Sequence, residues 1–244
     1  MTESKGKIMR IGAICLAAGR GTRMESKVQK QYLLLQGKPV LYYSLKALEE
    51  SRVDDVVLVV PSGEEEYCQR EIVERFGFSK VSKIIEGGAE RYHSVIKGLS
   101  AVTKVDYVLI HDGARPFLSN DIIERSIEGA EKSSACVVGM PVKDTIKIAD
   151  ADGNIEITPD RTRVWQIQTP QAFKYSLIKK AYSLLEKQEN AGETSGLSIT
   201  DDAMVVEHFM NYKVKLVKGS YQNIKITTPE DMMIAEAFLG IKQN

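Results

Sequence analysis

The stretch MRIGAICLAAGRGTRMESKVQKQY, residues 9–32, joins an apolar run to a loop rich in glycine and basic residues. The run at residues 9–17 predicts a buried β-strand, because continuous apolar runs are typical of strands covered on both faces of a parallel sheet. The loop resembles a phosphate-binding loop but fits neither of the two best-known patterns. The dinucleotide pattern would need glycine where Met24 stands, and no Gly-Lys-Ser/Thr triplet occurs.

Further apolar runs follow the first, and helical patterns separate them. These runs are too continuous for strands with one wet face, which would alternate apolar and polar residues. The expected strands are residues 55–61, 82–87, 106–112 and 134–140. Strands that alternate with helices predict a doubly wound α/β fold with a mostly parallel sheet, in which ligands bind beyond the carboxyl ends of the strands.

Two of the expected helices carry start signals. Pro39 is expected at the first helical position, where its missing N–H is not needed. Ser62 and Glu65 are expected to form a capping box before the next helix. The remaining helices of this half are expected at residues 90–102 and 121–132.

One segment interrupts the alternation of strands and helices. Residues 145–161, TIKIADADGNIEITPDR, alternate apolar and polar side chains on both sides of Asp152-Gly153, which is a strong hairpin signal. We therefore expect an extended β-hairpin arm at about residues 142–164. A two-stranded ribbon is marginally stable alone, so the arm should pack either on a partner subunit or on its own domain.

The rest of the chain returns to strands and helices. They are expected as a strand at residues 163–169, a helix at about 174–189, a short helix through Met204, strands at 212–219 and 223–227, and a helix from Pro229. No internal repeat and no low-complexity linker occurs, so residues 1–244 are expected to form a single domain.

The composition limits the partners of the protein. Among 244 residues, 33 Lys and Arg balance 33 Asp and Glu, so neither nucleic acid nor a membrane is an expected partner. No apolar run approaches the ~20 residues that span a bilayer, and the N-terminal residues show no signal-peptide pattern. The three cysteines form no C-x-x-C pair, so we expect neither a zinc site nor a disulfide framework. These features predict a cytoplasmic protein with a local anion site.

The opening loop is the first candidate site. Its small residues permit close backbone approach to a ligand, and their N–H groups can line an anion-binding nest. They are Ala17, Ala18, Gly19 and Gly21. Arg23 and Lys30 would add positive charge. Basic loop residues are often only solvated surface, but four cations within eleven residues of a neutral chain favour an anion site.

Two later turns offer further candidates. Gly87 and Gly88 follow an expected strand, and Ser94 would lie near the start of the next helix. Its hydroxyl could contact a ligand or hydrogen-bond its own backbone. Asp112 ends another expected strand and could bind a metal, hold a substrate hydroxyl or pair with Arg115.

Polar residues in the last part of the chain complete the candidate set. They are Thr145 and Arg161 beside the hairpin, Thr169 in TPQAF, Thr200 in TDDA, and Lys225 in NIKIT. In the strand expected at residues 223–227, Lys225 would face away from Ile224 and Ile226, and so point to solvent or into a cleft.

The chain lacks patterns for base-assisted nucleophilic catalysis. Neither G-x-S-x-G nor H-E-x-x-H occurs, and His111 beside Asp112 is expected to be structural, because adjacent strand residues point to opposite faces. A site rich in Arg, Lys and Thr suits phosphate transfer, where catalysis is mainly positioning and charge neutralisation. A phosphate monoester, with a second pKa of about 6, needs no general base as nucleophile.

Together these motifs resemble one family, the 2-C-methyl-D-erythritol 4-phosphate cytidylyltransferases of the non-mevalonate isoprenoid pathway. The matching stretches are LAAGRGTRM, KQYLLLQGKPVL, GGAERYHSV, HDGARPF, VKDTIK, TPQAF, TDDA and NIKITTPEDM. Each block alone is weak, but eight in family order are specific. The resemblance implies a Rossmann-like nucleotidyltransferase fold whose arm interlocks two subunits of a homodimer.

The resemblance also implies a reaction. CMP passes from CTP to 2-C-methyl-D-erythritol 4-phosphate, which gives 4-diphosphocytidyl-2-C-methyl-D-erythritol and pyrophosphate, with Mg²⁺ held mainly by the CTP phosphates and no metal ligand assigned to the protein. Carried over by motif, Arg23 and Lys30 would stabilise the charge on the α-phosphate. Arg161, reaching across the dimer, and Lys225 would position the acceptor phosphate for in-line attack.

The same resemblance assigns two binding sets. The nucleotide-binding set is Ala17, Ala18, Gly19, Gly21, Gly88 and Ser94. The substrate-binding set is Asp112, Arg115, Thr145, Thr169 and Thr200, the last at the acceptor phosphate. Two positions depart from the family pattern. Gln29 replaces a proline, which predicts a less rigid loop, and Ala89 stands where many members carry aspartate.

Other functions remain open at this point. A ribitol 5-phosphate cytidylyltransferase would share the fold and most motifs, but those enzymes tend toward AGG and VRPF where this chain has AAG and GARPF. A sugar-1-phosphate nucleotidyltransferase is less favoured. A non-catalytic nucleotide-binding module would have no reason to keep all four catalytic candidates, and a GT-A glycosyltransferase normally carries a D-x-D metal motif, where HDG offers one acid.

Overall fold

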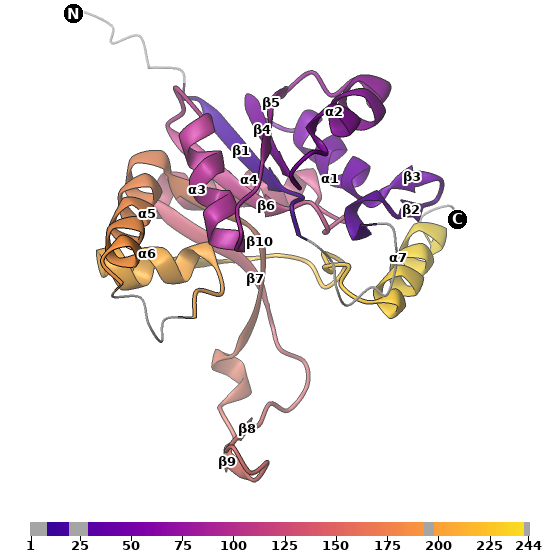
Figure 1. Ribbon diagram of the computed structural model, residues 1–244. Helices are drawn as coiled ribbons and strands as arrows, with labels where there is room; N and C mark the ends of the chain where they lie inside the picture. The colour runs from indigo at the N-terminus through magenta and orange to yellow at the C-terminus, as the bar shows by residue number, and fades with distance from the viewer. Residues whose placement is uncertain (1–8, 20–28, 193–197, 242–244) are drawn as a thin grey trace, which may run out of the picture.

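The computed structural model describes residues 9–19, 29–192 and 198–241. A seven-stranded sheet with the order β11-β7-β10-β6-β1-β4-β5 forms its centre (Figure 1). The strands are β1 (Ile11–Leu16), β4 (Asp55–Val60), β5 (Val81–Glu86), β6 (Tyr107–Asp112), β7 (Ala135–Pro141), β10 (Trp165–Lys174) and β11 (Lys215–Lys218). Every neighbouring pair is parallel except the two that β10 makes with β6 and β7. The mostly parallel sheet confirms the predicted α/β fold class.

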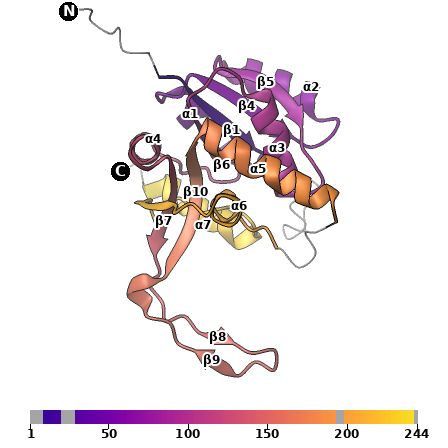
Figure 2. The same cartoon turned by 90° about the vertical axis from the view of Figure 1, so that its left-hand side faces the viewer.

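Helices cover both faces of this sheet (Figures 1 and 2). They are α1 (Val40–Glu49), α2 (Glu65–Cys68), α3 (Arg91–Ala101), α4 (Asn120–Ser133), α5 (Tyr175–Asn190), α6 (Asp202–Met210) and α7 (Pro229–Ile241). Shorter elements are the π-helix η3 (Gln69–Glu74), the 3-10 helices η2 (Lys30–Tyr32) and η4 (Arg161–Arg163), and the paired strands β2 (Leu34–Leu35) and β3 (Lys38–Pro39). Within the described ranges, no helix is both long and apolar enough to cross a membrane.

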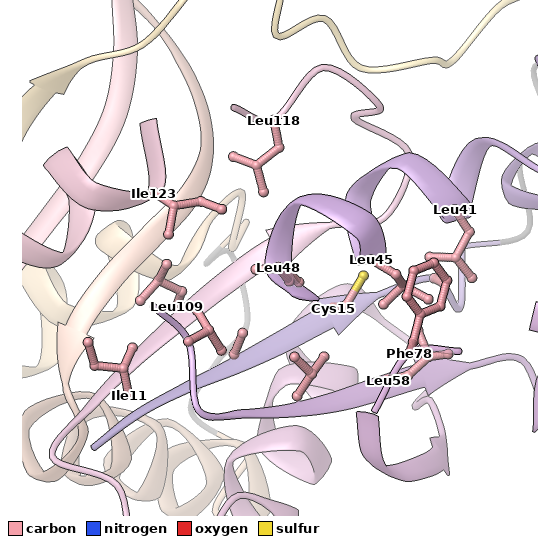
Figure 3. Close-up of a cluster of buried hydrophobic side chains, with 14 of the residues drawn as sticks. Ile11, Cys15, Leu41, Leu45, Leu48, Leu58, Phe78, Leu109, Leu118 and Ile123 are labelled. Carbon is pink, nitrogen blue, oxygen red and sulfur yellow. The ribbon is translucent and has the colours of Figure 1, made fainter. Parts of the chain in front are cut away.

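Alternate residues of the central strands fill two hydrophobic cores, one on each face. Ala13 and Cys15 of β1 point into the core under α1, α2 and α4, whereas Ile14 between them points into the core under α3, α5 and α6. Figure 3 shows Leu45 and Leu48 of α1 facing Cys15. Each fully buried leucine or isoleucine contributes about 1.5–3 kcal/mol. Burial on both faces explains why the strand is a continuous apolar run.

Both predicted helix starts differ from the structure. Pro39 is the N-cap of α1, one residue before the first helical position, and its φ of −56° suits that place. The capping box predicted at Ser62 and Glu65 is wrong. Helix α2 begins at Glu65 after Glu64, whose side chain makes no capping hydrogen bond within the described part of the chain. Gly63, with φ of +80°, turns the chain between Ser62 and the helix.

Residues 223–227, all of them described, form no strand, contrary to the prediction. Single hydrogen bonds to the loop after β6 hold this segment instead. The Ile226 N–H donates to Ala114 O over 2.8 Å, and Arg115 Nη1 donates to Asn223 O over 2.8 Å. A strand needs a ladder of successive bonds to one neighbour, and this segment makes isolated bonds only. The other predicted strands and helices are present, with ends shifted by one to a few residues.

The predicted hairpin is confirmed. β8 (Ile148–Ala149) and β9 (Ile155–Ile157) pair in antiparallel fashion. At the turn, Gly153 has φ of +85°, and Asp150 Oδ1 accepts a hydrogen bond from the Asp152 N–H over 3.0 Å. The arm leaves the sheet between β7 and β10 and extends away from it (Figures 1 and 2). Every residue of its two strands, β8 and β9, is exposed, so these strands do not pack on the sheet of their own chain.

Candidate active site

A cavity of about 230 Å³ opens where β1 and β6 end and α3 begins. Most of the site residues predicted from the sequence line it, and they come from four separate parts of the chain. They are Ala17, Ala18, Gly19, Lys30, Gly88, Ser94, Asp112 and Lys225. The cavity lies beyond the carboxyl ends of parallel strands, which is where doubly wound sheets bind ligands.

The end of β1 and the turn before α3 pack closely against each other. A Cβ atom at Gly87 would lie 2.4 Å from Ala18 Cβ, and one at Gly88 would lie 2.2 Å from His93 Cβ. Only glycine fits at these two positions. The Gly88 N–H donates to Ser94 Oγ over 3.0 Å, so the Ser94 hydroxyl fixes the turn through the backbone, one of the two roles left open for it.

Lys30 enters the cavity from η2, beside the opening loop. Its stem reaches Gly19, where a Cβ atom would lie 3.9 Å from Lys30 Cε. Gln29, where the family resemblance leads us to expect a proline, has φ of −64°, the value that a proline ring imposes. Gln31 Nε2 donates to Gln29 Oε1 over 2.6 Å. The predicted nucleotide residue Gly21 and catalytic residue Arg23 lie outside the described residues.

Asp112 is the centre of an ion cluster in the wall of the cavity. Its Oδ2 lies 2.9 Å from Lys225 Nζ and 3.6 Å from Arg115 Nε, and its Oδ1 lies 3.4 Å from Arg91 Nε. Burial alone would raise the pKa of Asp112, but the charges of these three cations outweigh burial and hold that pKa well below its usual range. Of the three roles considered for Asp112, the structure contains the ion pair with Arg115.

Lys225 points into the cavity, which decides between the two directions that the sequence left open. The irregular segment 223–227 directs it there because Asn223 anchors that segment. Asn223 is fully buried, and its Nδ2 donates to Thr169 O over 2.9 Å. Thr169 also accepts a hydrogen bond from the Asp112 N–H at its Oγ1 over 3.0 Å, so it supports Asp112 from behind.

His111 is structural, as predicted. It is fully buried, and its Nδ1 lies 3.1 Å from Thr169 Oγ1. Burial lowers the pKa of His111 to about 4, because the charged imidazolium is poorly solvated there. His111 is therefore neutral near pH 7.

Three predicted residues lie away from the cavity. Thr145 and Arg161 belong to the arm, where both are exposed and Arg161 Nη1 donates to Lys143 O over 2.9 Å. Thr200 is exposed before α6, and its Oγ1 contacts Met204 Sδ at 3.7 Å. The sequence-based site is therefore assembled only in part by one described chain.

Sequence reasoning missed Arg91 and Asp202. Arg91 lines the cavity and makes a bidentate pair with Asp202, with Nη1–Oδ1 and Nη2–Oδ2 distances of 3.0 and 2.8 Å. Both residues occur within the quoted motifs GGAERYHSV and TDDA, but 111 positions separate them. The sequence signal for Arg91 and Asp202 was a charged residue inside each motif. Their contact with each other is seen only in the folded structure. Among the described residues, no group of three His, Cys, Asp or Glu side chains could hold a metal ion.

Comparisons with known proteins identify relatives of this chain. The family model described as 2-C-methyl-D-erythritol 4-phosphate cytidylyltransferase matches residues 11–241. A protein of that name from Lachnoclostridium phytofermentans is 52% identical over 235 residues, which are 96% of this chain and 98% of the relative. Another of that name from Lachnospira eligens is 54% identical over 228 residues, or 93% of this chain and 98% of the relative.

Solved structures show the same likeness. The 4-diphosphocytidyl-2C-methyl-D-erythritol synthase from Anaerococcus prevotii superposes with a TM-score of 0.82 at 35% identity, over 95% of this chain and 96% of that one. The 2-C-methyl-D-erythritol 4-phosphate cytidylyltransferase from Thermus thermophilus gives 0.74 at 30% identity, over 93% and 98%. With a family model over nearly the whole length and relatives above 50% identity, the chain belongs to the 2-C-methyl-D-erythritol 4-phosphate cytidylyltransferase family.

Proposed function

We propose that this chain transfers CMP from CTP to 2-C-methyl-D-erythritol 4-phosphate, with release of pyrophosphate. The observation that carries this assignment is the cavity, in which glycine turns and the cations Lys30 and Lys225 meet at the carboxyl ends of the strands. Relatives named for this activity match more than 90% of the chain. As family members are cytidylyltransferases, a non-catalytic nucleotide-binding module does not account for the chain.

The reaction is an in-line displacement at the α-phosphorus of CTP. An oxygen of the acceptor phosphate forms the new P–O bond, and the bond to the β-phosphate breaks with its electron pair on the departing pyrophosphate. The acceptor phosphate is mostly ionised at pH 7, because its second pKa is about 6, so no general base is needed. We assign Lys30, with Arg23, to the charge on the α-phosphate, and Lys225 to the acceptor phosphate.

We assign the two binding sets to different parts of the site. We assign the nucleotide to the opening loop and the turn before α3. Its residues are Ala17, Ala18, Gly19, Gly21, Gly88 and Ser94. We assign the methylerythritol group to Asp112, supported by Arg115 and Thr169. An ionised Asp112 can accept hydrogen bonds from the acceptor hydroxyls.

We assign the metal to the nucleotide. Mg²⁺ prefers to keep waters and to bind substrate phosphates with few protein ligands. Asp112 is already shared by three cations, so it does not suit a metal ligand. Mg²⁺ would then be held mainly by the CTP phosphates, where it neutralises charge during transfer.

We propose that the protein is a homodimer in which each arm reaches the cavity of the other subunit. Thr145 and Arg161 lie on the arm, remote from the cavity of their own chain, and the arm exposes Ile148, Ile155 and Ile157. Exposed isoleucines on an isolated ribbon favour a protein partner. In this arrangement residues 1–244 act as one domain with its arm at about residues 142–164.

We also propose that the enzyme works in the cytoplasm. Its cysteines, Cys15, Cys68 and Cys136, are free and buried. Reduced thiols are typical of the cytosol, where disulfides are rare.

The function is tested by measuring pyrophosphate release with purified protein and Mg²⁺. Each of the four ribonucleoside triphosphates is combined with methylerythritol phosphate or with ribitol 5-phosphate. We expect turnover with CTP and methylerythritol phosphate, and at least ~10-fold lower kcat/KM with the ribitol compound, because an unmatched buried polar group disfavours the wrong substrate. Preference for ribitol 5-phosphate would support the alternative acceptor, and no turnover with CTP and either acceptor would refute the assignment.

A further inference from the structure

An ion pair next to the cavity has no part in the transfer described so far. Arg91 is the first residue of α3, and its guanidinium lies between two carboxylates. Both terminal nitrogens bind Asp202, and Nε faces Asp112 Oδ1 at 3.4 Å. We propose that Arg91 is a positioning residue for the acceptor side of the site, which orients Asp112, and that Asp202 holds Arg91 in place. This inference rests on the acceptor role proposed for Asp112.

Asp202 is held too firmly to follow Arg91. Its side chain is fully buried at the start of α6, and Tyr182 OH donates to its Oδ1 over 2.6 Å. The Asp202 N–H also donates to Gln171 Oε1 over 3.0 Å, which ties α6 to β10. Because hydrogen bonds hold both the main chain and the side chain of Asp202, its bidentate pair with Arg91 has a single geometry. Because the guanidinium is planar, that geometry also sets the direction of Arg91 Nε.

Asp112 needs a further cation to orient it, because Lys225, the cation closest to it, has another role in the proposed reaction. Lys225 Nζ lies 2.9 Å from Asp112 Oδ2, and in the proposed reaction it also binds the acceptor phosphate. When Lys225 is drawn toward that phosphate, Arg91 on Oδ1 and Arg115 on Oδ2 still hold the carboxylate. Asp112 then stays ionised and oriented, so that its remaining lone pairs can accept hydrogen bonds from a polyol phosphate.

The cluster also carries net positive charge. Arg91, Arg115 and Lys225 outnumber the carboxylates Asp112 and Asp202 by one. Removing the charge of Asp202 would release Arg91, whose Nε would then no longer be held toward Asp112 Oδ1. We therefore expect loss of the Arg91–Asp202 pair to raise the KM for the acceptor more than the KM for CTP.

The test compares Asp202→Asn with Tyr182→Phe, since both change the hydrogen bonding of the same buried carboxylate. Asp202→Asn breaks the charge pair with Arg91, and Tyr182→Phe keeps it. We expect Asp202→Asn to raise the KM for methylerythritol phosphate at least ~10-fold, the scale of one charge-assisted hydrogen bond, with the KM for CTP changed less than about twofold. Tyr182→Phe should lower the melting temperature and leave both KM values near those of the wild type.

Arg91→Lys is the second variant, and it replaces the first if Asp202→Asn does not fold. It keeps the charge but cannot make the fork, so we expect the same selective rise in the acceptor KM. Equal KM changes for both substrates, or an equal acceptor effect in Tyr182→Phe, would show a merely structural pair and overturn the proposal. Wild-type protein inactive with either acceptor would instead refute the proposed function.

Discussion

Lys30 is the residue whose charge we expect to matter most in the transition state. It lines the cavity beside Gly19, where the α-phosphate of CTP is placed in the proposed reaction. Lys30→Ala should lower kcat at least ~100-fold, the scale of losing one transition-state charge contact. Steady-state kinetics with varied CTP measures this, with Lys132→Ala, at an exposed side chain of α4, as control. A change confined to the KM for CTP would contradict the assigned role.

Asp112 should make folding stability depend on pH. Burial would raise its pKa, but Arg91, Lys225 and Arg115 lower it overall. A carboxyl with a depressed folded-state pKa stabilises the protein above its unfolded pKa of about 4, and this contribution is lost as the pH falls below that value. Asp112→Asn should lower the free energy of unfolding by on the order of 2 kcal/mol at pH 7, less than for an enclosed pair, because Arg91 and Lys225 are 29% and 35% exposed.

Urea unfolding between pH 7 and pH 3.5 measures this contribution. The difference between wild type and Asp112→Asn should be constant near neutral pH and shrink below pH ~4. Glu131→Gln, which breaks an exposed pair with Arg52, should change the free energy of unfolding by less than ~1 kcal/mol. A difference for Asp112→Asn that does not shrink in acid would show that the ion pairs are not its cause.

At this scale the sequence predicted individual site residues better than it predicted which residues contact each other. Asp112 and Lys225 were found because each stands at an informative place in a motif. Arg91 and Asp202 were missed because the physical evidence for them is their mutual distance, and no local pattern encodes a contact across 111 positions. Ser94 and Gly88 were found, but their contact with each other appears only when the turn folds back on α3.

The arm is the element whose role is easiest to separate from the rest. If Arg161 serves the partner's cavity, two inactive variants should complement each other. In a mixed dimer of Lys30→Ala and Arg161→Ala, one cavity lacks both side chains and the other lacks neither. After exchange of subunits, an equal mixture should recover roughly a quarter of wild-type activity, since half of the dimers are mixed and each has one intact cavity.

The measurement is specific activity before and after mixing, with each variant mixed with itself as control. The oligomeric state is followed in parallel by analytical ultracentrifugation. No recovery in a sample that contains mixed dimers would place Arg161 in the cavity of its own chain. A monomeric protein that is fully active would show that the arm of another chain is not part of the site.

The central strands were predictable because each carries its own evidence, a continuous apolar run such as that of β1. The capping box at Ser62 and the strand at 223–227 were not. Both predictions used a local signal whose meaning depends on other parts of the fold. Gly63 turns the chain between Ser62 and the helix, so Ser62 does not form the capping box. The segment 223–227 is held by scattered hydrogen bonds rather than by a neighbouring strand.

At the scale of the molecule, the sheet order explains why the site is assembled from remote segments. β1 lies between β4 and β6, so the loop after β1 meets both the turn that leads into α3 and the loop that follows β6. The segment 223–227 is then bound to that second loop. The class of fold could be predicted from the order of elements, whereas the antiparallel insertion of β10 between β6 and β7 could not.

The solitary arm leads to a prediction about protein concentration. Its two short strands are paired with each other and exposed throughout. If each cavity is completed by the arm of another chain, a protomer that has lost its neighbour is a folded protein without a finished site. The rate per protomer would then fall on dilution and return on concentration, with its midpoint near the dissociation constant of the two chains.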